Sequence, residues 1–410
     1  MTLQAPKGLL PHIVLVGKRN VGKSSLLNAL TQQDLSIVSD HPGTTTDPVE
    51  KTFELQPFGP VVFIDTAGLD DMGTLGQQRI ERSKHRIDAA DLILFVVDTP
   101  PSDKETLQLF NLFKTRPSSN LLLIFNKCEQ IKAPSLLRSE WESMTSLTPL
   151  FVSCLTGAGI ETLREVLVSS LESHRPLPLL LADLVTPPNL VVLVIPIDKE
   201  APQGRLILPQ VQALRELLDN DIASLVVNER ELGYALTHNL KTQPALVVTD
   251  SQAFLKVVAD VPLDVPLTSF SILLARQKGD LITYIKGAQF ISQLKNGDKV
   301  LIAELCSHRP ISEDIGRIKI PRWLRQHTGK DIVFEVASGK EIPQDLSGFS
   351  LIIQCGGCVA NRALIQSRIQ QANAVGVAIT NYGLCIAYLH GILERSIQPF
   401  PEALHAYNHP

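Results

Sequence analysis

The first residues in the sequence that could do chemistry form a loop at positions 17–24, which reads Gly-Lys-Arg-Asn-Val-Gly-Lys-Ser. The loop fits the pattern G-x-x-x-x-G-K-S/T and lies between an apolar run typical of a strand and a pattern typical of a helix. Backbone N–H groups in such a loop surround phosphate groups, and the positive end of the helix dipole strengthens the attraction. We therefore expect Lys23 to reach the β- and γ-phosphates of a nucleotide and Ser24 to bind Mg²⁺. The alternative, a glycine turn formed by chance, does not explain the strand–loop–helix context.

Two other strand ends carry motifs that could choose the nucleotide. Asn126, Lys127 and Glu129 lie in the run Asn-Lys-Cys-Glu, and Ser153 and Cys154 follow a later apolar run. These runs resemble the NKxD and SA-type motifs by which the small GTPase superfamily reads guanine. A carboxylate at the fourth place of NKxD accepts two hydrogen bonds from guanine, and adenine offers neither donor. The sequence therefore predicts GTP over ATP, with Glu129 standing where the family usually has aspartate.

Further residues are expected to act on the γ-phosphate. Asp65 ends an apolar strand in the run Asp-Thr-Ala-Gly, where it can hold the water shell of the metal ion, and the N–H of Gly68 can meet the phosphate. The run at 42–47, Pro-Gly-Thr-Thr-Thr-Asp, resembles the switch I signature of the TrmE–Era-like GTPases, which implies that Thr45 joins Ser24 on Mg²⁺. Leu69 stands where Ras-like enzymes place the glutamine that orients water.

The same resemblance implies slow intrinsic hydrolysis of GTP to GDP and phosphate, stimulated by K⁺. Asn20 matches the asparagine that holds K⁺ in potassium-activated members, and a turn residue without a ligand is the alternative. Segments 34–48 and 66–80 would be the two switches. The catalytic residues are then Lys23, Thr45, Asp65 and Gly68. The residues expected to bind GTP are Gly17, Asn20, Val21, Gly22, Lys23, Ser24, Ser25, Thr45, Asp65, Gly68, Asn126, Lys127, Glu129, Ser153 and Cys154.

A second kind of chemistry is indicated by three of the six cysteines. Cys306 is followed two residues later by His308, and Cys355 and Cys358 form a C-x-x-C pair with two glycines between them. Each group directly follows an apolar run, and the glycines allow the backbone to fold tightly over a metal. Three thiolates with an imidazole could bind zinc, and three thiolates with an open fourth position could bind an iron–sulfur cluster. Reduced core cysteines are the third possibility.

The elements that would position these residues form an α/β pattern in three parts. Residues 1–174 alternate apolar strands (12–16, 49–55, 61–65, 91–97, 121–125 and 150–152) with amphipathic helices, which predicts a mostly parallel sheet covered on both faces. Prolines interrupt the pattern in a linker at 175–189. A second α/β domain is expected at 190–269, with strands 190–195, 223–227 and 245–248 and helices 209–218, 229–238 and 252–258. The third, at 270–410, begins with a long helical stretch and continues with strands 299–303, 332–336, 351–353 and 375–380.

Composition excludes several classes of protein. With 410 residues, 44% hydrophobic residues and a net charge of −4, the chain can form several cores and is not disordered. It has no run of 18 apolar residues and no sequence typical of a signal peptide, and six cysteines are too few for a disulfide scaffold. We therefore expect a cytoplasmic protein without a membrane segment. The small net charge also argues against a nucleic-acid-binding surface.

Taken in order, these features resemble the GTPase maturation factors of [FeFe]-hydrogenase: a TrmE–Era-like GTPase domain, a dimerisation-type α/β domain, and a cluster domain with C-x-H and a distant C-x-x-C. The runs that carry the resemblance lie at 195–199, 204–210, 302–306 and 381–383, and the similarity covers essentially the whole chain. It implies a homodimer formed through the middle domain and a [4Fe–4S] cluster in the third. It also implies a scaffold or carrier for a transient diiron precursor, with the hydrogenase apoprotein and radical-SAM maturases as partners.

The sequence departs from this family at one ligand. The family pattern places a second histidine directly before the C-x-x-C pair, and Gln354 stands there in this chain. Cys306, Cys355 and Cys358 therefore carry over as ligands of the cluster. The fourth ligand is open among His308, Glu304, water and a ligand brought by the precursor.

Two other functions fit parts of the sequence. A zinc-containing TrmE–Era-like GTPase in ribosome or tRNA maturation would need a basic surface with aromatic side chains, yet aromatic residues make up only 5% of the chain. A metabolic enzyme with a redox cluster would need a further cofactor motif, and we recognise none. For the carrier, we expect GTP to drive the exchange of partners and not the metal chemistry itself.

Overall fold

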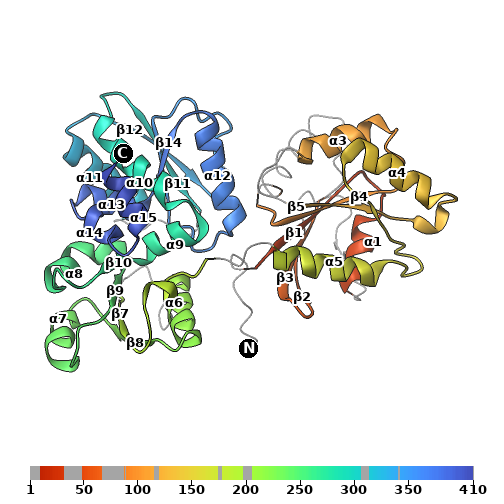
Figure 1. Ribbon diagram of the computed structural model, residues 1–410. Helices are drawn as coiled ribbons and strands as arrows, with labels where there is room; N and C mark the ends of the chain where they lie inside the picture. The colour runs from red at the N-terminus through yellow and green to blue at the C-terminus, as the bar shows by residue number, and fades with distance from the viewer. Residues whose placement is uncertain are drawn as a thin grey trace, which may run out of the picture. The chain divides into compact units, whose positions relative to one another are not determined.

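The computed structural model describes residues 10–31, 49–66, 87, 89–114, 120–173, 178–196, 206–305, 314–339 and 342–409. The chain divides into two compact units, Met1–Pro176 and Leu177–Pro410, and each is described by itself (Figure 1). In the described residues no helix combines the length and the apolar character needed to cross a bilayer.

The first unit is built on a sheet with the strand order β2-β3-β1-β4-β5-β6. Its strands are β1 (His12–Val16), β2 (Val49–Leu55), β3 (Gly59–Asp65), β4 (Leu92–Val97), β5 (Asn120–Phe125) and β6 (Leu150–Phe151). Strand β2 runs antiparallel to β3 at one edge, and the other neighbours are parallel. Each strand expected here from an apolar run is present, with ends that differ by two residues at most. The mostly parallel α/β architecture is confirmed.

Helices cover both faces of this sheet because its strands are apolar on both sides. Helices α1 (Lys23–Thr31) and α5 (Ile160–Ser173) pack against one face with Ile13 and Leu15 of β1. Helices α3 (Lys104–Lys114) and α4 (Pro134–Thr145) pack against the other face with Val14 and Val16, around the buried ring of Trp141. The carboxyl ends of parallel strands meet at one edge, so the loops after β1, β3, β4 and β5 lie close together there.

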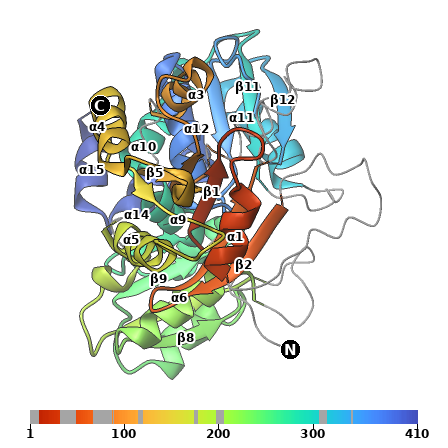
Figure 2. The same cartoon turned by 90° about the vertical axis from the view of Figure 1, so that its right-hand side faces the viewer.

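The second unit contains two wholly parallel sheets, with the orders β10-β9-β7-β8 and β12-β11-β13-β14. They lie one above the other in both views (Figures 1 and 2). The strands are β7 (Leu190–Val194), β8 (Ala223–Val227), β9 (Leu246–Thr249), β10 (Leu267–Ser269), β11 (Lys299–Glu304), β12 (Val333–Ser338), β13 (Leu351–Gln354) and β14 (Ala378–Asn381). The helices around them are α6 (Leu208–Asp219), α7 (Leu232–Tyr234), α8 (Phe254–Asp260), α9 (Phe270–Lys278), α10 (Leu281–Gln289), α11 (Ile320–Thr328), α12 (Arg362–Ala374), α13 (Tyr382–Leu389), α14 (Leu393–Ile397) and α15 (Pro401–Asn408).

Three elements of this unit differ from the sequence-based expectation. Strand β10 has only three residues and was too short to recognise from its pattern. The long helical stretch after residue 270 is broken between α9 and α10, where the Asp280 side chain accepts a hydrogen bond from Thr283 N and starts a new helix. The helix expected at 229–238 is instead the short α7 followed by a π-helical turn, Ala235–Asn239.

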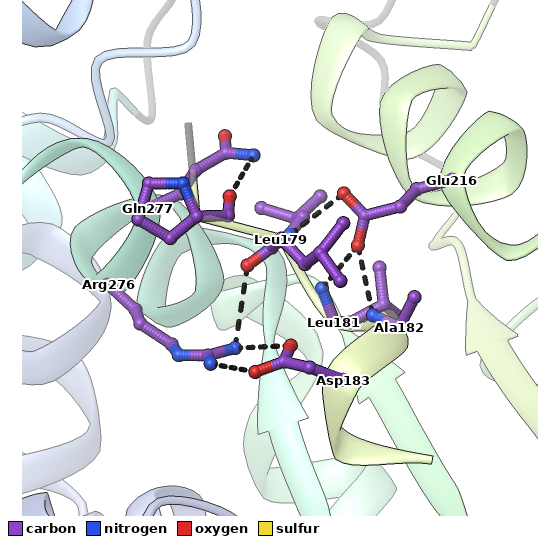
Figure 3. Close-up of polar contacts among 9 residues, drawn as sticks. Leu179, Leu181, Ala182, Asp183, Glu216, Arg276 and Gln277 are labelled. Atoms are coloured by element: carbon purple, nitrogen blue, oxygen red, sulfur yellow. Dashed lines mark hydrogen bonds and ion pairs between the residues drawn. The ribbon is translucent and has the colours of Figure 1, made fainter. Parts of the chain in front are cut away.

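The segment 178–184, inside the range where we expect the linker, is fixed to the second unit (Figure 3). The Glu216 carboxylate on α6 accepts hydrogen bonds from the backbone N–H groups of residues 180, 181 and 182 at 2.8–2.9 Å. Arg276 on α9 pairs with Asp183, and Gln277 Nε2 donates to the carbonyl oxygen of Pro178 at 3.1 Å. These contacts hold the beginning of the second unit against α6 and α9.

Candidate functional site

The expected phosphate loop follows β1 and has the backbone geometry that requires glycine. Gly17 and Gly22 have φ angles of 152° and 93°. A Cβ atom on Gly17 would lie 2.3 Å from the carbonyl oxygen of Val96, and one on Gly22 would lie 2.2 Å from Asn126 Nδ2. Both positions therefore exclude any larger residue, and the loop packs directly on the ends of β4 and β5.

The lysine of this loop is held over the loop itself. The Lys23 side chain is only 7% exposed. Its Nζ atom donates to the carbonyl oxygens of Gly17 at 2.9 Å and of Lys18 at 2.7 Å. The ammonium is therefore held at the loop for which the motif predicts a phosphate contact.

Two oxygen ligands suited to Mg²⁺ lie beside the lysine. Ser24 Oγ at the start of α1 donates to Asp65 Oδ2 at the end of β3, at 2.6 Å. Burial raises the pKa of the Asp65 carboxyl, while the Ser24 hydrogen bond and the charge of Lys23 act in the opposite direction. A hydroxyl and a carboxylate placed together fit Mg²⁺, which takes hard oxygen ligands and keeps part of its water shell. Thr45 and Gly68, the other expected residues of this part, lie outside the described residues.

The expected guanine motif is joined to the phosphate loop. Asn126 Nδ2 donates to the carbonyl oxygen of Val21 at 2.9 Å, and Asn126 Oδ1 accepts from Cys154 N at 3.4 Å. Lys127 Nζ donates to the carbonyl oxygen of Asn20 at 2.9 Å and pairs with Asp98 at 2.5 Å. The two motif residues therefore connect the phosphate loop with the loops that would surround the base.

Glu129 lies at the outer edge of this region, in a short 3₁₀ turn, Cys128–Gln130. Its carboxylate is exposed, and a hydrogen bond from Ser153 lowers its pKa. The glutamate is therefore ionised at neutral pH, which reading guanine N1–H and the 2-amino group requires.

Sequence reasoning missed two residues of this site. Lys18 Nζ pairs with Asp103 at 2.6 Å and with Glu105 at 2.8 Å, and so ties the phosphate loop to the start of α3. Asp98, the partner of Lys127, directly follows β4. Its position at the carboxyl end of a strand, where Asp65 also lies, was a usable signal. The loop motif, in contrast, does not specify the residue at position 18.

The second candidate site is a cavity of about 240 Å³ in the second unit, lined in part by Cys355 and Cys358. The loop after β13 carries both cysteines, and Tyr382 of α13 lines the same cavity. The lining also includes Phe270 and Leu274 of α9. The two cysteines thus line the same cavity as apolar side chains.

Gly357 allows the C-x-x-C loop to follow a tight path. Gly357 has a φ of 65°, and a Cβ atom there would lie 2.8 Å from the Ile365 side chain. The loop starts as a continuation of the sheet, since Cys355 N donates to the carbonyl oxygen of Ala303 at 3.0 Å. Cys355 Sγ in turn accepts from Leu305 N at 3.1 Å, a hydrogen bond that favours the thiolate.

Two buried cations lie near these cysteines. Lys278 at the end of α9 is 2% exposed, and its Nζ donates to the carbonyl oxygens of Gly357, Cys358 and Ala360 at 3.1, 3.2 and 2.8 Å. Burial lowers the pKa of Lys278 to about 8, with Cys358 acting in the opposite direction. Burial also lowers the pKa of Arg368 to about 10, opposed by Cys355. Positive charge of this kind stabilises thiolates and an anionic metal cluster.

Glu304, an expected candidate for the fourth ligand, also lines the cavity. Glu304 is held by Arg317, whose Nη2 and Nε donate to its carboxylate at 2.7 and 3.1 Å. Gln354 is 1% exposed and donates to the hydroxyl of Tyr284 on α10. It is not among the described residues that line the cavity.

Cys306 and His308 lie outside the described residues. Within the part of the chain that the structure describes, no three His, Cys, Asp or Glu side chains are close enough to hold a metal ion. The described donors that line the cavity are the thiols of Cys355 and Cys358 and the carboxylates of Glu304 and Asp314. The two thiols fit a soft metal or an iron–sulfur cluster completed by a ligand from elsewhere.

The phosphate loop, its magnesium oxygens and the guanine motif on this sheet define a TrmE–Era-like P-loop GTPase, followed by a second α/β unit. Family models agree: the 50S ribosome-binding GTPase model matches residues 12–127. The Hydrogen maturase F dimerization domain matches residues 180–279, and the Hydrogen maturase F tetramerization domain matches residues 282–399. The chain belongs to the hydrogen maturase F family of GTPases, and its second unit consists of oligomerization domains.

Curated relatives match a smaller part of the chain. The mitochondrial 5-taurinomethyluridine-tRNA synthase subunit GTPB3 of Mus musculus is 37% identical over 171 residues, which are 39% of this chain and 34% of that protein. The tRNA modification GTPase MnmE of Aquifex aeolicus is 34% identical over 163 residues, 40% of this chain and 35% of that protein. The chain thus spans about a third of the length of these relatives.

Solved GTPase structures are also similar to this chain. Era of Aquifex aeolicus is 21% identical, with 54% of this chain and 93% of that chain covered and a TM-score of 0.36. The G domain of the T. maritima FeoB iron transporter is 27% identical, with 40% and 99% covered and a TM-score of 0.32. These TM-scores are below 0.5, so the assignment depends on the family models.

Proposed function

We propose that the protein is a GTP-hydrolysing carrier of an iron–sulfur cluster that assembles or delivers the diiron precursor of [FeFe]-hydrogenase. The observation that carries this proposal is the cavity with Cys355 and Cys358 on a loop held by the buried Lys278. A volume of about 240 Å³ suits a guest of limited size, and the two buried cations near its cysteines, Lys278 and Arg368, suit an anionic one. Membership of the hydrogen maturase F family gives the biological context.

In this proposal Cys306, Cys355 and Cys358 hold a [4Fe–4S] cluster, which supplies a redox-active iron centre with an exchangeable coordination position. Because Arg317 already binds Glu304, that carboxylate is a poor candidate for the fourth ligand. The fourth position is then taken by His308 or by a ligand that is not part of the protein. An exchangeable ligand suits a carrier, since the carrier has to bind its cargo and release it.

The first unit would bind and hydrolyse GTP. Lys23 would contact the β- and γ-phosphates, and Ser24 and Asp65 would hold Mg²⁺ together with Thr45. A K⁺-stimulated reaction is proposed from Asn20, which matches the asparagine of potassium-activated members and is exposed on the phosphate loop. The protein would act in the cytoplasm as a homodimer or larger oligomer. GTP hydrolysis would control how it binds and releases its partners, namely the hydrogenase apoprotein and the radical-SAM maturases.

A zinc-containing GTPase in ribosome or tRNA maturation is the second candidate. The relatives named as tRNA modification GTPases favour it, but they match only about 40% of the chain. The family models of the second unit, residues 180–279 and 282–399, favour the maturation carrier.

Metal analysis separates the two candidates. Protein purified and reconstituted without oxygen should contain about four irons and four sulfides per chain and give a [4Fe–4S] EPR signal after reduction. Cys355→Ser should lose this signal, whereas Cys128→Ser, which changes a half-buried thiol of the first unit, should keep it. One tightly bound zinc per chain, with no iron after reconstitution, would replace the carrier proposal with the tRNA or ribosome GTPase.

A further inference from the structure

Strand β12 lies at one edge of its sheet and is accessible along its whole length. Each of its residues is exposed or half-buried, and the side chains of Val333 and Val336 are each 45% exposed. The strand at the other edge, β14, is buried except for its first residue, which is half-buried. In the described part of the chain β12 pairs with β11 alone. An exposed apolar edge strand is a template for pairing with another chain, so this edge is a candidate interface.

The backbone of β12 has one set of hydrogen-bonding groups that points away from β11. Val333 N donates to the carbonyl oxygen of Asp298 at 3.0 Å, and Gly339 N donates to that of Glu304 at 2.9 Å. Because the direction of these groups alternates along a strand, the odd-numbered residues of β12 face β11. The groups that point outward belong to the even-numbered residues, which are Phe334, Val336 and Ser338.

The outward groups match those of a second copy of the same strand. In an antiparallel pair with a twofold axis at Val336, the two Val336 residues face each other as a hydrogen-bonded pair, and Phe334 of each copy faces Ser338 of the other. This register uses every outward-pointing residue of the strand. Moving the axis by one residue leaves either Phe334 or Ser338 outside the pairing, and an axis at Glu335 would also oppose two carboxylates.

The side chains also fit this register. The exposed Val336 side chains of the two copies meet at the axis, and Glu335 of each copy lies opposite Ala337 of the other, so no like charges are directly opposed. Lys299 Nζ pairs with Glu335 at 3.2 Å, which offsets the charge of the carboxylate within each copy. The strand is therefore complementary to itself in both its backbone and its side chains.

We propose that β12 pairs with β12 of a second copy in this antiparallel register, so that two four-stranded sheets become one continuous sheet. The partner is a second copy because the strand is self-complementary and lies within residues 282–399, which match the tetramerization domain. Together with a separate contact through the dimerization domain at residues 180–279, a twofold contact of this kind closes a tetramer. The contact needs no metal cluster, so it goes beyond the proposed function.

The full-length chain without a cluster is the protein to measure. Val336→Lys places two lysines opposite each other at the axis, so the association of dimers into tetramers should weaken about tenfold to hundredfold. The control is Val375→Lys, which changes a valine of similar exposure, 47%, at the end of α12 and should behave as the wild type. Sedimentation velocity over a range of concentrations measures the association.

A charge pair should restore the contact. When Val336→Lys and Val336→Glu are mixed, opposite charges meet at the axis, and native mass spectrometry should detect tetramers that contain both variants. Wild-type affinity between Val336→Lys dimers would overturn the inference. A wild type that forms no tetramers at any concentration would overturn it as well.

Amide hydrogen exchange reads the register without any substitution. In the wild-type tetramer the amides of Phe334, Val336 and Ser338 should exchange slowly, and dilution to dimers should accelerate them. The amides of Val333 and Gly339, which are bonded to β11, should remain slow at both concentrations. Mass spectrometry with electron-transfer fragmentation separates neighbouring residues. Equal exchange of the even-numbered amides at both concentrations would overturn the inference, even if Val336→Lys did not fold.

Discussion

Lys278 Nζ lies 3.2 Å from the carbonyl oxygen of Cys358, and it also donates to two other carbonyls of the same loop. A single buried ammonium therefore fixes the path of the C-x-x-C loop and places a positive charge next to its thiols. Both effects matter for a cluster, because the loop sets the position of the sulfurs and the charge sets the relative stability of oxidised and reduced iron.

The first prediction concerns this charge. Lys278→Met keeps much of the side-chain volume and removes the charge, so it should lower the midpoint potential of the cluster by on the order of 100 mV at pH 7. The direction follows because a nearby cation stabilises the more negative, reduced cluster. EPR-monitored redox titration measures the potential. Lys286→Met on α10, where the lysine is exposed, is the control and should leave it unchanged. Equal potentials in wild type and Lys278→Met would contradict the assigned role.

The second prediction concerns the position where the family has histidine. Because the Gln354 amide contacts the Tyr284 hydroxyl on α10, Gln354→His should leave the EPR and absorption spectra of the cluster unchanged. Gln354→Ala should give the same spectra and serves as the control for packing. A new EPR signal in Gln354→His that is absent in Gln354→Ala would show that residue 354 reaches the iron.

The third prediction concerns the choice of nucleotide. Glu129→Ala removes the carboxylate expected to accept two hydrogen bonds from guanine, so GTP binding should weaken about a hundredfold while ATP binding stays weak and unchanged. Competition against a fluorescent GTP analogue measures both affinities. The control is Glu142→Ala on α4, which removes a surface carboxylate that accepts a hydrogen bond from Thr148 and should behave as the wild type. An equal loss of GTP affinity in Glu129→Ala and Glu142→Ala would show that Glu129 does not bind guanine.

The fourth prediction uses pH. Burial raises the pKa of the Cys154 thiol to about 11, so this thiol stays protonated in the folded protein through neutral and mildly alkaline pH. Only the thiolate reacts with iodoacetamide. Its alkylation rate, followed by mass spectrometry of the Cys154 peptide, should therefore rise with pH toward a midpoint near 11. In protein unfolded in urea the midpoint should fall to about 8.5. A folded-state midpoint near 8.5 would show that Cys154 is not buried against Asn126.

Much of the first unit could be predicted because each function there has a local signal. The apolar strands are continuous runs, and Gly17, Lys23 and Ser24 belong to one short pattern with fixed backbone roles. The cysteine cavity is different, since its walls come from distant segments. Nothing around Lys278 marks it as the partner of a loop 79 residues later, and the hydroxyl of Tyr382 depends on the space left at Gly316. Such contacts arise from tertiary packing, which sequence periodicity does not encode.

The most direct test of the carrier account is transfer of the diiron precursor. The protein is loaded together with the radical-SAM maturases, purified away from them without oxygen, and mixed with hydrogenase apoprotein, and hydrogen production is then measured. The account predicts that loaded wild type and Cys128→Ser activate the hydrogenase and that Cys355→Ser does not. Activation by Cys355→Ser equal to that by the wild type, or no activation by loaded wild type, would contradict it.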